Sequence, residues 1–253
     1  MIPDWILAGF EPWVFAALLA TSFIGSFITV ALGIGGGALL LAVMASLMPP
    51  AALIPVHGAV QFGSNVFRAA LLFSHTHWPP ILAFGLGTAA GAAMGGAVVV
   101  NLPPAVVQVG VGGFVIFSVL ARPPAWLSRV PFLTGAISSF LTMFFGATGV
   151  FVANFTKSLS LPRKSHVATH AAMMTMQHVL KVVAFGLLGF AFAPWAGFIA
   201  AMILSGLAGT LAGRQVLNHI GDAGFKRALD VILLLISARL VWVGLRELLW
   251  NAA

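Results

Sequence analysis

The chain has 253 residues, of which 60% are hydrophobic and only 7% are charged. That composition leaves too little polar surface for a soluble domain of this size. Apolar runs of about 20 residues, the length that crosses a bilayer as a helix, recur along the chain. The short alternating strands of a membrane barrel are not found. We therefore expect an all-α polytopic membrane protein with roughly 8–10 membrane segments.

Net charge and cysteine content exclude further kinds of partner and site. The formal net charge is +7, but the basic residues are scattered over short loops, which indicates membrane orientation and no nucleic-acid partner. The absence of cysteine excludes disulfides and thiolate metal sites. The first residues include Asp4 and Glu11 but no Lys or Arg, unlike a signal peptide.

The first half is expected to hold an interrupted apolar segment, a polar helix and two further spans. In chain order these lie at about 13–48, with a glycine cluster at 33–37, and at about 55–73, 81–100 and 105–121. The polar helix carries His57, Gln61, Asn65 and Arg68. Gly87, Gly91 and Gly95 lie four residues apart in the next span, a spacing that lets helices approach closely in lipid.

After a loop at 122–131 the same order of elements returns. The second interrupted segment, polar helix and two spans lie at about 132–159, 165–190, 195–213 and 227–248. The second polar helix carries His166, His170, Gln177, His178 and Lys181. We therefore divide the chain into a first repeat at 1–125 and a second at 126–253, which together form one membrane domain.

The two halves also match residue by residue. Residues 21–37 recur 113 residues later, and Thr21, Ile24, Ser26, Phe27, Thr29, Gly33 and Gly36 become Thr134, Ile137, Ser139, Phe140, Thr142, Gly146 and Gly149. At the same offset Pro49, His57, Asn65 and Arg68 correspond to Pro162, His170, His178 and Lys181. A repeated histidine and a repeated cation inside apolar helices are informative, because such residues are costly within a bilayer.

The basic loops predict the topology. The loops at 122–131, 157–164 and 214–227 contain Lys or Arg, whereas those at 101–104 and 191–194 contain none. The positive-inside rule places the first group in the cytoplasm and the second outside, together with both ends of the chain. Each interrupted segment must then return to the side it left, either as a re-entrant hairpin or as a pair of spans. The halves are thus inverted repeats, as in many transporters.

The duplicated residues favour an anionic cargo. A helix that restarts after a glycine break directs its N–H groups and positive dipole end at the break. Arg68 lies toward the cytoplasm and Lys181 toward the outside, and no Asp or Glu lies in the middle of a span. His57 and His170, about three helical turns from these cations, can donate to an oxyanion or carry a proton. The substrate-binding residues are predicted to be Gly33, Gly36, His57, Asn65, Arg68, Gly146, Gly149, His170, His178 and Lys181, with Thr29 and Thr142 as supporting hydroxyls.

Each feature also has a simpler interpretation. The glycines can serve tight helix packing alone, His57 and His170 can hydrogen-bond backbone across helices, and Arg68 can extend to the membrane interface. An intramembrane histidine-based metal or haem redox subunit is the alternative function, although the histidine spacings disfavour it. We expect no cofactor, and the sequence leaves open whether the protein forms a homodimer.

The glycine-rich break GIGGG, followed about twenty residues later by a histidine-bearing helix, and its weaker echo GATGV in the second half resemble the sulfite exporter TauE/SafE family. This family is also called the toluene sulfonate uptake permease family, and the resemblance covers nearly the whole chain. It implies a multi-pass carrier of the bacterial inner membrane, not an enzyme, that moves sulfite or sulfonates such as sulfoacetate. A carrier for another small anion is the alternative. Export is expected, because an inside-negative potential of about 100 mV expels each negative charge with about 2.3 kcal/mol.

Overall fold

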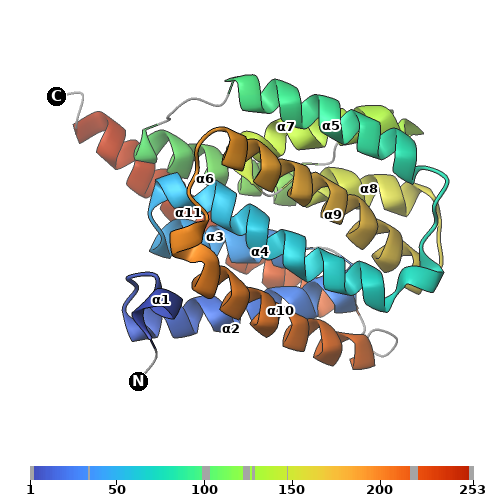
Figure 1. The fold of residues 1–253 in the computed structure, drawn as a ribbon, viewed down its shortest axis with the longest axis horizontal. Helices are drawn as coiled ribbons and strands as arrows, with labels where there is room; N and C mark the ends of the chain where they lie inside the picture. Colours follow the sequence, from blue (N-terminus) through green and yellow to red (C-terminus); the bar gives the residue numbers. More distant parts are fainter. Residues whose placement is uncertain are drawn as a thin grey trace.

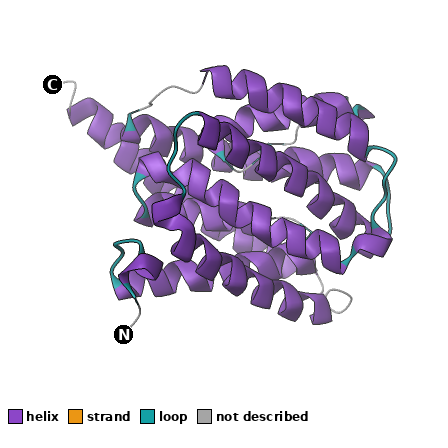
Figure 2. Cartoon of the chain, in the orientation of Figure 1, coloured by secondary structure: helices purple, strands orange, loops and turns teal. Residues whose placement is uncertain are grey.

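The computed structural model of the protein describes residues 3–33, 35–98, 103–121, 126, 129–146, 148–216 and 222–250. Every regular element within these ranges is a helix, which confirms the predicted all-α fold (Figure 2). Three stretches are long and apolar enough to cross a membrane by length and composition: Pro12–Leu32, Ile81–Val98 and Ala193–Gln215.

The helices follow the predicted order in both halves. The first half holds α1 (Asp4–Leu7), α2 (Pro12–Leu32), α3 (Gly36–Leu47), α4 (Pro50–Leu71), α5 (Ile81–Val98) and α6 (Pro104–Leu120), with a 3₁₀ turn η1 (Phe73–His75) after α4. The second half holds α7 (Pro131–Phe145), α8 (Gly149–Ser158), α9 (Arg163–Leu187), the 3₁₀ turn η3 (Ala193–Trp195), α10 (Ala196–Val216) and α11 (Asp222–Trp250). Proline occupies the first position of α2, α4, α6 and α7, where its missing N–H has no helical acceptor to lose.

Two predicted boundaries were wrong. The first polar helix was expected to begin near Pro55, but α4 begins at Pro50 and contains Pro55 within its second turn. A proline this close to a helix start removes one backbone hydrogen bond without ending the helix. The last helix, α11, likewise begins five residues before its predicted start at 227, and the other predicted helices begin and end within about three residues of the predicted positions.

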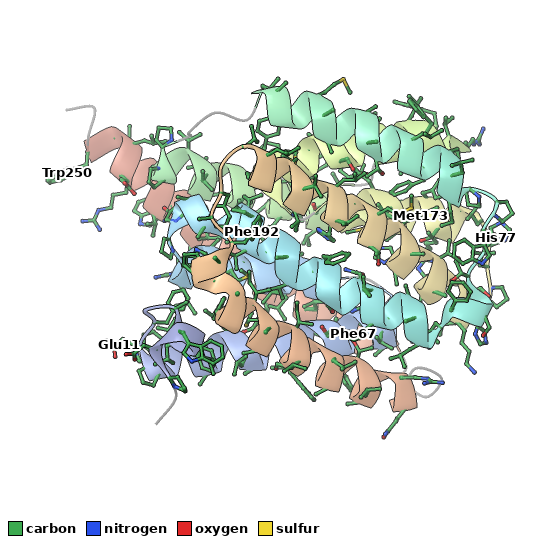
Figure 3. All side chains as sticks on the ribbon, viewed as in Figure 1. Glu11, Phe67, His77, Met173, Phe192 and Trp250 are labelled. Carbon is green, nitrogen blue, oxygen red and sulfur yellow. The ribbon has the colours of Figure 1, made fainter. Side chains whose placement is uncertain are left out.

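The helices run back and forth between two ends of the molecule (Figure 1). One end, called the terminal end, holds α1 against the start of α10 and the last turns of α11 against the start of α6. At the opposite end, called the basic end, the Arg163 side chain donates to the carbonyl oxygen of Ala31. Figure 3 labels Glu11 and Trp250 at the terminal end and His77 at the basic end. The described residues of the three basic loops gather at the basic end, as the positive-inside rule predicts.

Both interrupted segments are helical hairpins with a short second arm. The chain reverses at Gly33 and Gly35, with φ angles of +84° and +105°, and at Gly146, with a φ of +76°. Glycine adopts this backbone region at little cost. α3 has 12 residues and α8 has 10, or about 18 Å and 15 Å, which is too short to cross a hydrocarbon core of about 30 Å. These lengths favour the re-entrant form over a pair of spans.

The two halves interlock, because the main helix pairs take one member from each half. α2 packs against α10, α7 against α5, α4 against α9 and α6 against α11. A Cβ on Gly91 of α5 would clash with the carbonyl oxygen of Ala136, and a Cβ on Gly209 of α10 would clash with that of Phe23. Because Ala136 lies 113 residues after Phe23, these two contacts are equivalent. The glycines spaced four residues apart in α5 therefore lie at a helix–helix contact with α7, and α10 makes the same kind of contact with α2.

Corresponding helices of the two halves start at opposite ends of the molecule, as inverted repeats require. α2 starts at the terminal end beside α1, whereas its counterpart α7 starts at the basic end, where Pro131 lines the same cavity as His77. The boundary between the repeats near residue 125 stays a prediction. In the centre of the molecule, α4 and α9 lie against each other and are flanked by α10 and α5 (Figure 1).

Candidate functional site

The central helix pair α4–α9 brings the buried polar residues of the two halves together. α4 and α9 run in opposite senses, and a Cβ on Gly58 of α4 would lie 2.6 Å from Cε of Lys181 on α9. Lys181 is completely buried and Arg68 is 2% exposed. The other buried polar residues of this pair are His57, Ser64, Asn65, Thr169, His170, Gln177 and His178.

The Lys181 cluster consists of His57, Thr142, His178 and Lys181. The imidazole of His57 stands edge-on to that of His178, with ring centroids 6.1 Å apart. Lys181 Nζ donates to the Thr142 hydroxyl at 3.5 Å, the limit of a hydrogen bond. His57 Nδ1 and both ring nitrogens of His178 are buried without a hydrogen-bond partner among the described residues. This cluster therefore contains several polar atoms that protein groups do not satisfy.

The Arg68 cluster consists of Ser26, Ser64, Asn65, Arg68 and His170. Arg68 Nη1 donates to Asn65 Oδ1 at 2.8 Å, and Nη2 donates to Ser64 Oγ at 3.2 Å. Ser64 Oγ in turn lies 2.9 Å from Ser26 Oγ on α2. His170 of α9 lies within electrostatic range of Arg68. Arg68 Nε has no partner in the described part of the chain, so the guanidinium retains free donors.

The two clusters are related by the repeat. Arg68, Asn65 and Ser64 correspond to Lys181, His178 and Gln177 at the 113-residue offset. Each cluster combines a cation from one half with the histidine of the other half. The histidine and the cation of the same helix belong to different clusters, because they lie eleven residues or about 16 Å apart. The sequence placed His57, Arg68, His170 and Lys181 inside apolar helices, and their pairing across the halves follows only from the antiparallel packing of α4 and α9.

The glycine breaks reach both clusters through backbone carbonyl groups. His57 Nε2 lies 3.2 Å from the Gly37 oxygen, and His170 Nε2 lies 3.5 Å from the Gly149 oxygen. The alternative in which these histidines hydrogen-bond backbone across helices is therefore realised for one ring nitrogen of each. In the second half, Thr142 Oγ1 donates at 3.1 Å to the Gly146 oxygen, which links this break to Lys181.

Three predicted residues have a structural explanation of their own. Gly36 packs against the backbone of Gly25 at the crossing of α2 and α3, where a Cβ would clash with the Gly25 oxygen. Thr29 donates to the Gly25 oxygen of its own helix at 2.8 Å. A Cβ on Gly33 would lie 3.2 Å from the ring of His166, outside both clusters. These contacts support the packing interpretation for this part of the first break.

The structure adds buried polar residues that the sequence analysis did not single out as binding residues. Gln177 Nε2 donates to the Ser138 oxygen at 3.2 Å and to Thr148 Oγ1 at 2.6 Å. Ser64 and Gln177 precede Arg68 and Lys181 by one helical turn, on the same helix face. That spacing, together with the duplicated Ser26 and Ser139, was the signal that could have identified them.

The buried cations have no carboxylate partner among the described residues. Asp4 and Glu11 lie at the terminal end, and Asp230 and Glu247 lie on α11. The alternative in which Arg68 extends to the interface is wrong, because its side chain is buried and held by Asn65 and Ser64. Within the described ranges, no three His, Cys, Asp or Glu residues are grouped as a metal site requires. The arrangement can therefore attract and hold an anion.

Two cavities lie near the central helix pair. A cavity of about 750 Å³ at the basic end is lined by His77, Arg129 and Ser158, among others. The backbone N–H of His77 donates to Thr169 Oγ1 at 2.9 Å, one residue before His170. A second cavity of about 410 Å³ is lined by Ala59 and Val182, the neighbours of Gly58 and Lys181.

Comparison with known proteins agrees with these features. The model of one family, described as "Sulfite exporter TauE/SafE", matches residues 18–240. No curated protein and no solved structure matches the chain. The matched region contains both helical hairpins, α4 and α9, and therefore both clusters. The resemblance predicted from the glycine break and the histidine-bearing helix is confirmed, and the protein is a membrane transporter that belongs to the sulfite exporter TauE/SafE family.

Proposed function

We propose that the protein is a secondary transporter of the bacterial inner membrane that exports small sulfur-containing anions, namely sulfite and sulfonates such as sulfoacetate. The observation that carries this proposal is the pair of buried cations, Arg68 and Lys181, without a carboxylate partner in the described part of the chain. The description of the family as sulfite exporters supports the same class of cargo.

The physical argument concerns charge inside the membrane. A buried cation without a counter-ion costs several kcal/mol, and a bound anion offsets that cost. The Lys181 ammonium and the N–H groups of the imidazole rings are hydrogen-bond donors. A sulfite or sulfonate group presents three oxygen acceptors on one sulfur atom, which several converging donors can bind at once. Hydrogen bonds between charged partners are the stronger ones, so this chemistry favours a compact oxyanion over a neutral solute.

The direction of transport follows from the membrane potential. The positive-inside rule assigns the basic end to the cytoplasm, and so an anion that leaves the cell moves toward the terminal end. An inside-negative potential of about 100 mV favours that movement by about 2.3 kcal/mol per charge without a coupling ion. Binding and release suffice for this activity, and no covalent step is required.

Transport by purified protein in liposomes tests the proposal. We expect uptake and release of radiolabelled sulfite by the wild type, with at least tenfold lower initial rates for Arg68→Gln and for Lys181→Gln. Lys157→Gln is the matched control, because Lys157 is exposed at the end of α8. An inside-negative potential should accelerate efflux. Equal sulfite flux in the wild type and both buried-cation variants would refute the role of the cations.

Competition separates the alternatives. Excess sulfoacetate should inhibit sulfite flux, whereas inhibition by phosphate or chloride alone would indicate a carrier for another small anion. Stoichiometric haem or metal in the purified protein would instead support the histidine-based redox subunit. The wild type is also tested without any sulfur anion inside the liposome, so that exchange and net transport are distinguished.

A further inference from the structure

We propose that the anion occupies two binding stations in series, one at the Lys181 cluster and one at the Arg68 cluster, and that each station is shared between the two halves of the chain. This inference rests on the proposed function and adds the number, composition and order of the binding sites. Each station binds a small sulfur oxyanion.

The Lys181 station has the larger number of unsatisfied polar atoms. Lys181 is completely buried and has, among the described residues, one long hydrogen bond, to Thr142. Three ring nitrogens of His57 and His178 are buried without a partner among the described residues. Buried polar atoms are almost always hydrogen-bonded in native proteins, and therefore a group of them around an ammonium marks a place for a ligand. The ligand has to be negative, because every charged or chargeable group in this cluster is a potential cation.

The Arg68 station is more rigid. Asn65 and Ser64 hold two of the guanidinium nitrogens, and Ser26 holds Ser64 from the neighbouring helix. The guanidinium still has free N–H groups, including the buried Nε, and it faces no carboxylate in the described chain. A planar guanidinium in a fixed orientation suits two oxygens of one oxyanion. His170 of the other half lies within electrostatic range of Arg68, and Leu72, four residues after Arg68, packs against Val167 and Ala168 on the helix that carries His170.

The stations are separate along the membrane normal. His57 and Arg68 lie eleven residues apart on α4, or about 16 Å, and His170 and Lys181 have the same separation on α9. Between them the helices carry buried apolar residues: Val60, Ala171, Met173 and Met174. One small oxyanion cannot contact both cations across that distance. The methionines between the stations have flexible side chains that can make room for a passing anion.

The two stations lie at different distances from the basic end. His77, which lines the cavity at the basic end, is tied through Thr169 to the residue before His170 in the Arg68 station. The second cavity is lined by apolar residues alone, among them Ala59 and Val182, and is therefore not assigned to the anion path. Because Arg68 lies nearer the basic end, an exported anion reaches the Arg68 station first and the Lys181 station second. Two like charges in neighbouring sites repel each other, which speeds release from the second, as in multi-site channels.

The number of bound anions tests this inference. Equilibrium dialysis of the purified full-length protein against radiolabelled sulfite is expected to give two sulfites per wild-type chain. Arg68→Gln and Lys181→Gln should each retain one, and Lys157→Gln should retain two. His170→Leu and His57→Leu provide a second variant for each station, and each should weaken one of the two binding events at least tenfold.

The outcomes distinguish this inference from the proposed function. One sulfite per wild-type chain would overturn the two stations and leave anion transport intact. Two sulfites that persist in both Arg68→Gln and Lys181→Gln would show that the anions bind elsewhere. No sulfite or sulfoacetate binding by a folded wild-type protein would overturn the proposed function as well. Loss of both sulfites in every station variant would indicate a single shared site.

Discussion

Replacing Lys181 by methionine should stabilise the ligand-free protein while abolishing transport. The ammonium is completely buried, and its hydrogen bond to Thr142 is 3.5 Å long, so the substitution sacrifices little hydrogen bonding. Methionine has a similar length and fits a helix that already buries Met173 and Met174. Apolar replacement of buried charges raises the free energy of unfolding by about 1–4 kcal/mol in favourable cases. We expect a gain in this range for the ligand-free variant.

The same substitution should also weaken the binding of the anion, by an amount that can be calculated. A hydrogen bond to a charged group contributes about 1.5–3 kcal/mol, which corresponds to a roughly 10-fold to 150-fold weaker binding of the anion. Thermal unfolding in detergent, with and without sulfite, measures both effects. Sulfite should raise the melting temperature of the wild type and should do so much less in Lys181→Met. Lys157→Met, at an exposed position, is the control. A destabilised Lys181→Met protein, or one with normal sulfite flux, would refute the view that the lysine is an unpaired charge kept for a ligand.

The remaining predictions concern glycine positions and metal. Gly58→Ala should fold normally but transport sulfite several-fold more slowly, because the new Cβ would lie 2.6 Å from Lys181 Cε and displace the flexible ammonium; unchanged flux would contradict this. Gly91→Ala and Gly209→Ala should each lower the melting temperature by a similar amount, because each new Cβ meets a backbone oxygen of the neighbouring helix. Gly113→Ala, whose new Cβ would have open space around it, should leave the melting temperature unchanged. A lower melting temperature for this variant would refute the packing argument. Dialysis against a chelator should leave sulfite flux unchanged, and a loss restored by metal would favour the redox alternative.

Much of the fold was readable from the sequence because its determinants are local. Apolar runs, prolines at helix starts and basic loops each act within about twenty residues, and they predicted the helices, their order and the inverted orientation. The re-entrant form of the hairpins was left open, because both forms return the chain to the same side. The lengths of α3 and α8 favour the re-entrant form.

The candidate site was predictable residue by residue but not in its arrangement. His57, Arg68, His170 and Lys181 were identified because polar residues in apolar helices are costly. Their pairing depends on how α4 crosses α9, and no sequence spacing encodes a contact between helices so far apart in the chain. Thr29 illustrates the opposite case, because its repeat partner Thr142 contacts Lys181, whereas the Thr29 hydroxyl donates to the Gly25 oxygen of its own helix.

The interlocked helix pairs also constrain how the chain is made. The Ser205 hydroxyl on α10 donates to the Leu19 oxygen on α2, a contact between residues 186 apart in sequence. α2 leaves the ribosome first, yet its partner is nearly the last helix to be synthesised. The first half is therefore synthesised before the helices of the second half that cover its glycine-rich faces. Neither half by itself contains both members of any of the main helix pairs, so each half covers the faces that the other leaves open.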